Sequence, residues 1–139
     1  MNVLVDTSVW SLSLRRKPGD LNRVERSCVA ELTELISEGR VCLLGLIRQE
    51  VLSGIRTPAQ FGALRAVLRA FPDVTTDTSD FEGAAEASNK CQSKGVTVSV
   101  VDALVCAVAL NRGWTILTTD ADFEHHARIL PIQLHMVRE

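Results

Sequence analysis

The run Asn2-Val3-Leu4-Val5, followed directly by Asp6, decides the fold that we predict for this chain. Its three consecutive apolar residues do not alternate with polar ones, which is typical of a strand buried on both faces in a parallel sheet. Other segments favour strands for the same reason or through β-branched residues. These further strand candidates are residues 41–44, 114–117, 132–135 and a weaker edge candidate at 74–76.

Helical patterns alternate with these strand candidates. Apolar residues recur at three- and four-residue steps, and hydroxyl caps, a proline and several glycines mark helix ends. Ser79 and Glu82 are expected to form a capping box. The expected helices cover residues 8–14, 21–38, 47–52, 58–70, 79–94, 99–112 and 122–127. The alternation predicts one α/β domain over residues 1–139, with a central, mostly parallel sheet.

Composition excludes several classes of protein. The 139 residues are 46% hydrophobic and 23% charged, which is typical of a folded globular protein. No apolar run approaches the roughly 18 residues of a membrane span, and the start of the chain lacks a signal-peptide pattern. We therefore expect no membrane association. The cysteines form no Cys-x-x-Cys pair, so we expect no zinc site but reduced, mostly buried thiols, which are typical of a cytoplasmic protein. They are Cys28, Cys42, Cys91 and Cys106.

Four acidic residues, Asp6, Glu50, Asp102 and Asp120, follow strands or begin helices across the whole chain. In open parallel sheets, functional groups gather beyond the carboxyl ends of the strands, so these side chains are expected to converge. Crowded carboxylates repel one another unless a cation lies between them. The sequence therefore predicts a site for Mg²⁺ or Mn²⁺, whose preferred ligands are oxygens.

Each of these acids also has a structural interpretation when taken alone. Asp6 could cap a helix, Asp120 could occupy a turn, and Glu50 could be a solvated helix residue. Asp102, three residues after Ser99, could favour the helix dipole. Their joint position at one sheet edge favours the metal site over four separate structural roles.

Four segments then resemble, in order, the acidic motifs of PIN-domain ribonucleases, especially the VapC toxins of bacterial toxin–antitoxin pairs. The resemblance spans almost the whole chain. A single Asp-Thr-Ser would carry no weight, but four ordered motifs are specific. The segments are Val5-Asp6-Thr7-Ser8-Val9-Trp10, Glu50-Val51-Leu52-Ser53-Gly54, Asp102-Ala103-Leu104-Val105-Cys106-Ala107-Val108-Ala109 and Leu117-Thr118-Thr119-Asp120-Ala121-Asp122-Phe123.

The resemblance implies a five-stranded sheet ordered 3-2-1-4-5 with helices on both faces. It also implies an endoribonuclease that prefers single-stranded RNA and depends on Mg²⁺ or Mn²⁺. The expected partners are a VapB-like antitoxin that blocks the site and a second copy of the chain in a homodimer. The net charge of −2 predicts no general basic surface, so contact with RNA should be local.

In the mechanism that we expect, the metal activates a water for attack on the phosphodiester bond. Asp6, Asp102 and Asp120 would bind metal directly or through water, and Glu50 would bind it or hold one of its waters. Asp122 is a possible fifth acid.

Several residues beside these acids are candidates for substrate or site contacts, each with a capping or surface alternative. Thr7, Ser8 and Thr118 carry hydroxyls next to the acids, and Arg48 could bind phosphate. Adjacent helical histidines point in different directions, so His125 and His126 are expected at the surface.

Two alternatives remain open. A different α/β phosphoryl-transfer enzyme, such as a haloacid-dehalogenase-type phosphatase, would need a second aspartate where Ser8 stands, and a receiver domain would need an acidic pair near the first strand. The other alternative is a PIN-like module that is catalytically inactive, or a housekeeping RNA-binding or processing protein. A metal-dependent cleavage assay separates the inactive module from a nuclease.

Overall fold

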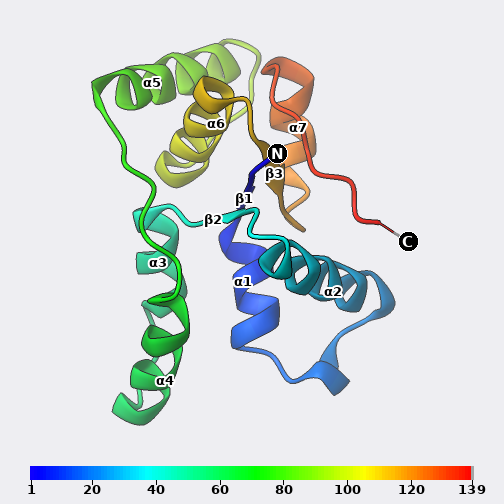
Figure 1. The fold of residues 1–139 in the computed structure, drawn as a ribbon. Helices are drawn as coiled ribbons and strands as arrows, with labels where there is room; N and C mark the ends of the chain where they lie inside the picture. Colours follow the sequence, from blue (N-terminus) through cyan, green and yellow to red (C-terminus); the bar gives the residue numbers. More distant parts are fainter. Residues whose placement is uncertain (139) are drawn as a thin grey trace.

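The computed structural model describes residues 1–138, and its centre is a small parallel sheet (Figure 1). The strands are β1 (Val3–Val5), β2 (Val41–Cys42) and β3 (Thr115–Leu117), in the spatial order β2-β1-β3. Val3 pairs with Val41 on one side and with Thr115 on the other. The residues of β1 have no exposed surface, which confirms the expectation of a strand buried on both faces.

The sheet is narrower than the five strands expected from the sequence. Within residues 1–138, the two outer segments each meet it at one isolated parallel bridge, Leu43 with Asp73 and Ile116 with Leu134. The first segment leaves the sheet soon after this bridge, because the side chain of Asp77 already caps the next helix. A single bridge holds a segment beside the sheet but does not continue the hydrogen-bonded ladder into a strand.

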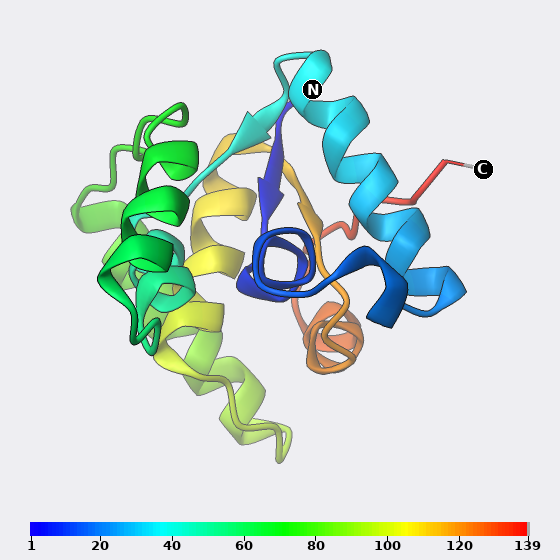
Figure 2. The same ribbon diagram turned by 90° about the horizontal axis from the view of Figure 1, so that it is seen from below.

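Helices cover the sheet on both sides, as expected. Figures 1 and 2 show α2 on one side of the strands and α6, with α5 beyond it, on the other. All expected helices are present, with ends that shift by a few residues. Their bounds are α1 (Thr7–Leu14), α2 (Arg23–Ser37), α3 (Gly45–Leu52), α4 (Pro58–Leu68), α5 (Thr78–Ser93), α6 (Val100–Arg112) and α7 (Asp122–Ile129), and a 3-10 turn occupies Pro18–Asp20.

Local capping explains most helix ends. The Thr57 side chain caps α4, Ser99 caps α6, and α6 ends at Gly113, which adopts a left-handed conformation with φ 68°. The expected capping box of Ser79 and Glu82 is wrong. Asp77 and Asp80 form it instead, because Asp77 is the residue with extended backbone that precedes the helix.

A buried ion pair holds α6 against α5. Asp80 is 1% exposed, and its carboxylate accepts hydrogen bonds from Arg112 at 2.8 and 2.9 Å and from Asn111 at 2.9 Å. The Arg112 hydrogen bonds hold the pKa of Asp80 well below its usual range, although burial opposes them. This pair fixes the helix that carries Asp102.

A second buried acid ties the end of the chain to α2. Glu31 is 3% exposed and accepts hydrogen bonds from the Arg138 guanidinium at 2.8 and 2.9 Å and from the Arg138 backbone N–H at 3.0 Å. His135 Nε2 lies 2.9 Å from the same carboxylate. Burial alone would raise the pKa of Glu31, but the hydrogen bonds from Arg138 and His135 outweigh it and lower the pKa to about 2.

The cysteines are free thiols, and all except the partly buried Cys42 are buried, as expected. Among the helices of residues 1–138, none combines the length and apolar character that crossing a membrane requires.

Candidate active site

Asp6 lies at the carboxyl end of β1 and caps α1, so both interpretations of this residue from the sequence describe its position. The residue is 4% exposed. Its Oδ2 accepts hydrogen bonds from Ser8 Oγ and Thr118 Oγ1, both at 2.8 Å, and from the Ser8 backbone N–H at 3.4 Å. These donors are neutral, so they orient the carboxylate without cancelling its charge.

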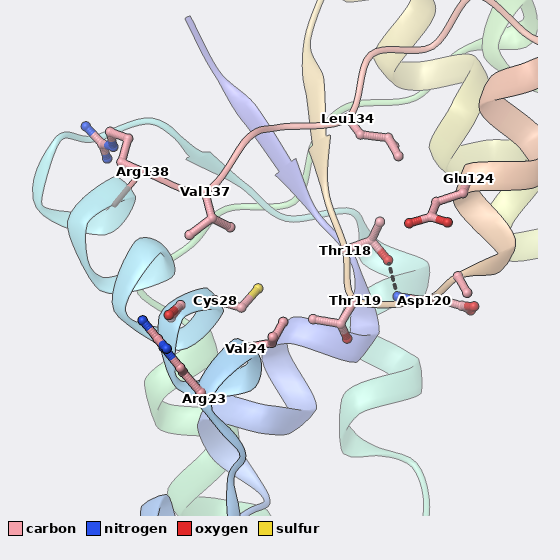
Figure 3. A pocket seen from close by; sticks show the side chains of 12 residues that line it. Arg23, Val24, Cys28, Thr118, Thr119, Asp120, Glu124, Leu134, Val137 and Arg138 are labelled. Atoms are coloured by element: carbon pink, nitrogen blue, oxygen red, sulfur yellow. Dashed lines mark hydrogen bonds between the residues drawn. The ribbon is translucent and has the colours of Figure 1, made fainter.

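The loop after β3 is fixed to the same point. Thr118 Oγ1 accepts a hydrogen bond from the Asp120 N–H at 3.0 Å, which Figure 3 shows as a dashed line. Ser8 Oγ accepts one from the Thr119 N–H at 3.0 Å. Asp120 Oδ1 in turn accepts the Asp122 N–H at 2.9 Å. The hydroxyls of Ser8 and Thr118 therefore join the ends of β1 and β3.

Glu50 reaches the site from α3. Its Oε1 accepts a hydrogen bond from Thr7 Oγ1 at 2.6 Å, although the two residues are 43 positions apart. This contact places Glu50 beside the first turn of α1, next to Asp6.

Asp102 stands in the first turn of α6, where Ser99 Oγ accepts its backbone N–H at 3.1 Å. Its side chain is 19% exposed. Burial, followed by the charges of Asp6, Asp120 and Glu50, raises the pKa of Asp102 to about 6, and a hydrogen bond from Ser99 opposes the shift. The carboxylates of Asp6, Asp120 and Glu50 thus lie close enough to Asp102 for their charges to raise its pKa.

No arginine or lysine among residues 1–138 forms an ion pair with any of these four carboxylates. The nearest basic side chain is that of His126, whose Nε2 lies 3.8 Å from Asp102 Oδ2. The four acids therefore form a negative cluster without a compensating positive side chain.

This cluster has the charge and the donor atoms for a hard divalent cation. In this conformation, however, no three acidic, histidine or cysteine side chains of residues 1–138 converge closely enough to hold one ion. Repulsion between the carboxylates favours such separation, and hydrogen bonds hold Asp6 and Glu50 at their present angles. Binding an ion would require some of these side chains to rotate toward a common point.

The remaining candidates differ in position. The Asp122 side chain is exposed, and its backbone N–H orients Asp120. Arg48 donates to Asp73 Oδ1 at 2.8 Å and to the carbonyls of Leu68 and Phe71. Its guanidinium is therefore engaged in holding α3 against the segment after α4.

The surface position expected for His126 is wrong, since this residue is 1% exposed, whereas His125 is exposed. His126 follows Phe123 by three positions on α7, so both lie on the buried face, with ring centroids 5.4 Å apart. The three-residue spacing from Phe123 was the sequence signal that indicated a buried position for His126, because residues three apart share one face of a helix.

A cavity of about 930 Å³ opens beside Asp120. Figure 3 shows that it lies between α2, the loop after β3 and the C-terminal segment. Its size admits a ligand much larger than an ion. Its lining includes Arg23, Cys28, Thr119, Asp120, Glu124 and Arg138.

Comparison with known proteins places the chain in a family. The PIN domain model matches residues 3–129. "VapC ribonuclease Mb1587" of Mycobacterium bovis and "Ribonuclease VapC11" of Mycobacterium tuberculosis are each 32% identical to the chain over 135 residues, which cover 94% of this chain and 96% of the relative.

Solved structures agree in fold. FitAcB from Neisseria gonorrhoeae has a TM-score of 0.73 at 21% identity and covers 96% of both chains. VapBC2 from Rickettsia felis, bound to a promoter DNA fragment, has a TM-score of 0.72 at 13% identity and covers 97% of this chain and 98% of its own. The fold, the matched residues and the extent of sequence identity lead to one conclusion: the chain belongs to the VapC group of the PIN domain family.

Proposed function

We propose that this chain is a metal-dependent endoribonuclease, acts as the toxin of a type II toxin–antitoxin pair, and hydrolyses RNA phosphodiester bonds. The observation that carries the proposal is the cluster of Asp6, Glu50, Asp102 and Asp120, in which burial, together with the charges of the other three acids, raises the pKa of Asp102 to about 6. A scaffold has no need of four repelling carboxylates, whereas a divalent cation turns them into a binding site. The VapC ribonucleases that resemble the chain support the same activity.

In this proposal, Asp6, Asp102 and Asp120 hold Mg²⁺ or Mn²⁺, and Glu50 holds it or one of its waters. The bound cation supplies an activated water and stabilises charge on the leaving oxygen. Thr118 keeps Asp6 oriented, and Thr7 does the same for Glu50. Asp122 serves mainly through its backbone N–H to Asp120, and its carboxylate is a possible further ligand.

The proposed partners are RNA as substrate, a VapB-like antitoxin and a second copy of the chain. VapBC and toxin–antitoxin complexes among the structures of similar fold support the antitoxin. The four free cysteines are compatible with the cytoplasmic location that we propose. We also propose that the segments bridged at Asp73 and Leu134 are the edge strands of a sheet ordered 3-2-1-4-5.

The direct test is to incubate the purified chain with single-stranded RNA and Mn²⁺, with and without a chelator. We expect cleavage that stops in chelator and in the Asp6→Asn variant. Glu82→Gln, which removes an exposed carboxylate of α5, is the matched control and should cleave like the wild type. Cleavage that persists in chelator would remove the metal mechanism. An absence of cleavage on every RNA class would favour the inactive PIN-like module.

A further inference from the structure

His126 is a buried polar side chain without a hydrogen-bond partner. Neither of its ring nitrogens meets one among residues 1–138, and both are shielded from solvent. The ring packs edge-on against Phe123 at an interplanar angle of 71°. An apolar side chain could make the same packing contact.

Leaving a buried polar group unsatisfied costs free energy, and folded proteins satisfy most such groups. An unpaired imidazole in this position therefore calls for a partner. His126 Nε2 lies 3.8 Å from Asp102 Oδ2, on a different helix. A hydrogen bond would need this distance to shorten by roughly 1 Å.

We propose that His126 is a positioning residue for Asp102, and that its Nε2–H donates a hydrogen bond to Asp102 Oδ2 when the carboxylates gather around the cation. This inference rests on the proposed nuclease function. A neutral imidazole with its proton on Nε2 is sufficient, so the role does not require a charged histidine.

Oriented carboxylates at the rest of the site support this role. Asp6 accepts a hydrogen bond from Thr118, Glu50 accepts one from Thr7, and Asp120 accepts one from the Asp122 N–H. His126 would give Asp102 a comparable donor from α7. Outer partners of this kind typically change metal affinity about 10–100-fold when they are removed.

The test measures Mn²⁺ affinity by electron paramagnetic resonance, and thermal stability in chelator, for three variants. His126→Phe keeps an aromatic ring but has no nitrogen. His126→Gln places an amide nitrogen near the position of Nε2, and His126→Asn places one near Nδ1. His125→Gln, at the exposed neighbouring position, is the matched control.

We expect His126→Phe to keep the melting temperature of the wild type, or to exceed it, and to bind Mn²⁺ about 10-fold more weakly. His126→Gln should recover most of the affinity, His126→Asn should not, and His125→Gln should match the wild type. In an Asp102→Asn background, His126→Phe should have no further effect, because the residue acts through Asp102.

Equal Mn²⁺ affinity of wild type and His126→Phe would overturn the inference and leave the nuclease proposal standing. An undiminished effect of His126→Phe in the Asp102→Asn background would overturn it as well. If the wild type neither binds Mn²⁺ nor cleaves RNA, both proposals are wrong.

Discussion

Thr118 donates a hydrogen bond of 2.8 Å to Asp6 Oδ2 and so joins the loop after β3 to the end of β1 across 112 positions of sequence. The same hydroxyl accepts the Asp120 N–H at 3.0 Å. One side chain thus orients one acid of the cluster and fixes the backbone of another. The contact is possible because parallel strands bring their carboxyl ends to the same edge of a sheet.

Thr118→Val should therefore affect stability and activity together. The substitution keeps the β-branched shape but removes the donor to Asp6 and the acceptor of the Asp120 N–H. We expect a loss of about 1–2 kcal/mol in the free energy of unfolding, measured with urea, and slower RNA cleavage. Thr118→Ser keeps the hydroxyl and should retain most of the activity. Equal cleavage by Thr118→Val and the wild type would show that this hydroxyl does not orient the site.

Asp102→Asn should stabilise the metal-free protein above neutral pH. The folded state raises the pKa of Asp102 from 3.8 to about 6, so the folded protein holds this proton more tightly than the unfolded chain does. Stability is therefore lost as the pH rises through this range, and the asparagine variant avoids the loss. In chelator at pH 8 we expect a gain of about 1–2 kcal/mol over the wild type, which closes near pH 4. Destabilisation at pH 8 would mean that the carboxylate has a structural role.

Mn²⁺ should reverse the order of these two proteins. A ligand that binds only the folded state stabilises it by about 2.7 kcal/mol at 100 times its dissociation constant. We expect the melting temperature of the wild type to rise with Mn²⁺ and that of Asp102→Asn to rise much less. A rise of equal size in both proteins would place the ion elsewhere on the chain.

Glu31 should make the fold sensitive to acid. Its pKa is lowered to about 2 in the folded protein, so its stabilisation is complete above the ordinary value of 4.5 and is lost as the pH falls toward 2. Glu31→Gln should be less stable than the wild type by about 2 kcal/mol at pH 6, with the difference disappearing near pH 2. Urea unfolding of the two proteins between pH 2 and pH 6 measures this difference and its disappearance. A stability difference that stays constant with pH would show that it does not arise from the charge of Glu31.

Asp80→Ala tests the support of α6. It leaves the Arg112 guanidinium without its carboxylate partner, and breaking a buried pair typically costs about 3–5 kcal/mol. Since Arg112 is partly exposed, we expect a loss near 3 kcal/mol in urea unfolding. Glu82→Gln removes an exposed carboxylate of α5, the helix that also carries Asp80, and should change the free energy of unfolding by less than about 0.5 kcal/mol. A small effect of Asp80→Ala would mean that packing alone holds α6 in place.

Local patterns predicted most of the fold. The uninterrupted Val3-Leu4-Val5 run gave the central strand, and Ser99 and Gly113 marked the ends of α6, because caps and glycines act within a few residues. Local patterns did not predict the number of strands in the sheet. Whether the segments near Asp73 and Leu134 extend the ladder depends on where the neighbouring chain turns, which no local pattern specifies.

The order of acidic residues along the chain indicated which carboxylates could meet, because strand ends in a parallel sheet face one edge. The neighbours of these carboxylates were harder to foresee. Arg48 lies near Glu50 in sequence, but its guanidinium donates to the segment after α4. His126 looked like a surface residue, but the packing of α7 turns it toward Asp102.

The sequence alone therefore determined the α/β class, the helix positions and the four acids with their family motifs, since each depends on local pattern and order. Only the tertiary structure decided that Thr118 orients Asp6, that Thr7 holds Glu50, and that an unpaired imidazole lies beside Asp102. The physical reason is distance along the chain: these contacts join residues that are far apart in sequence, and the direction of each side chain is set only when helices and sheet pack together.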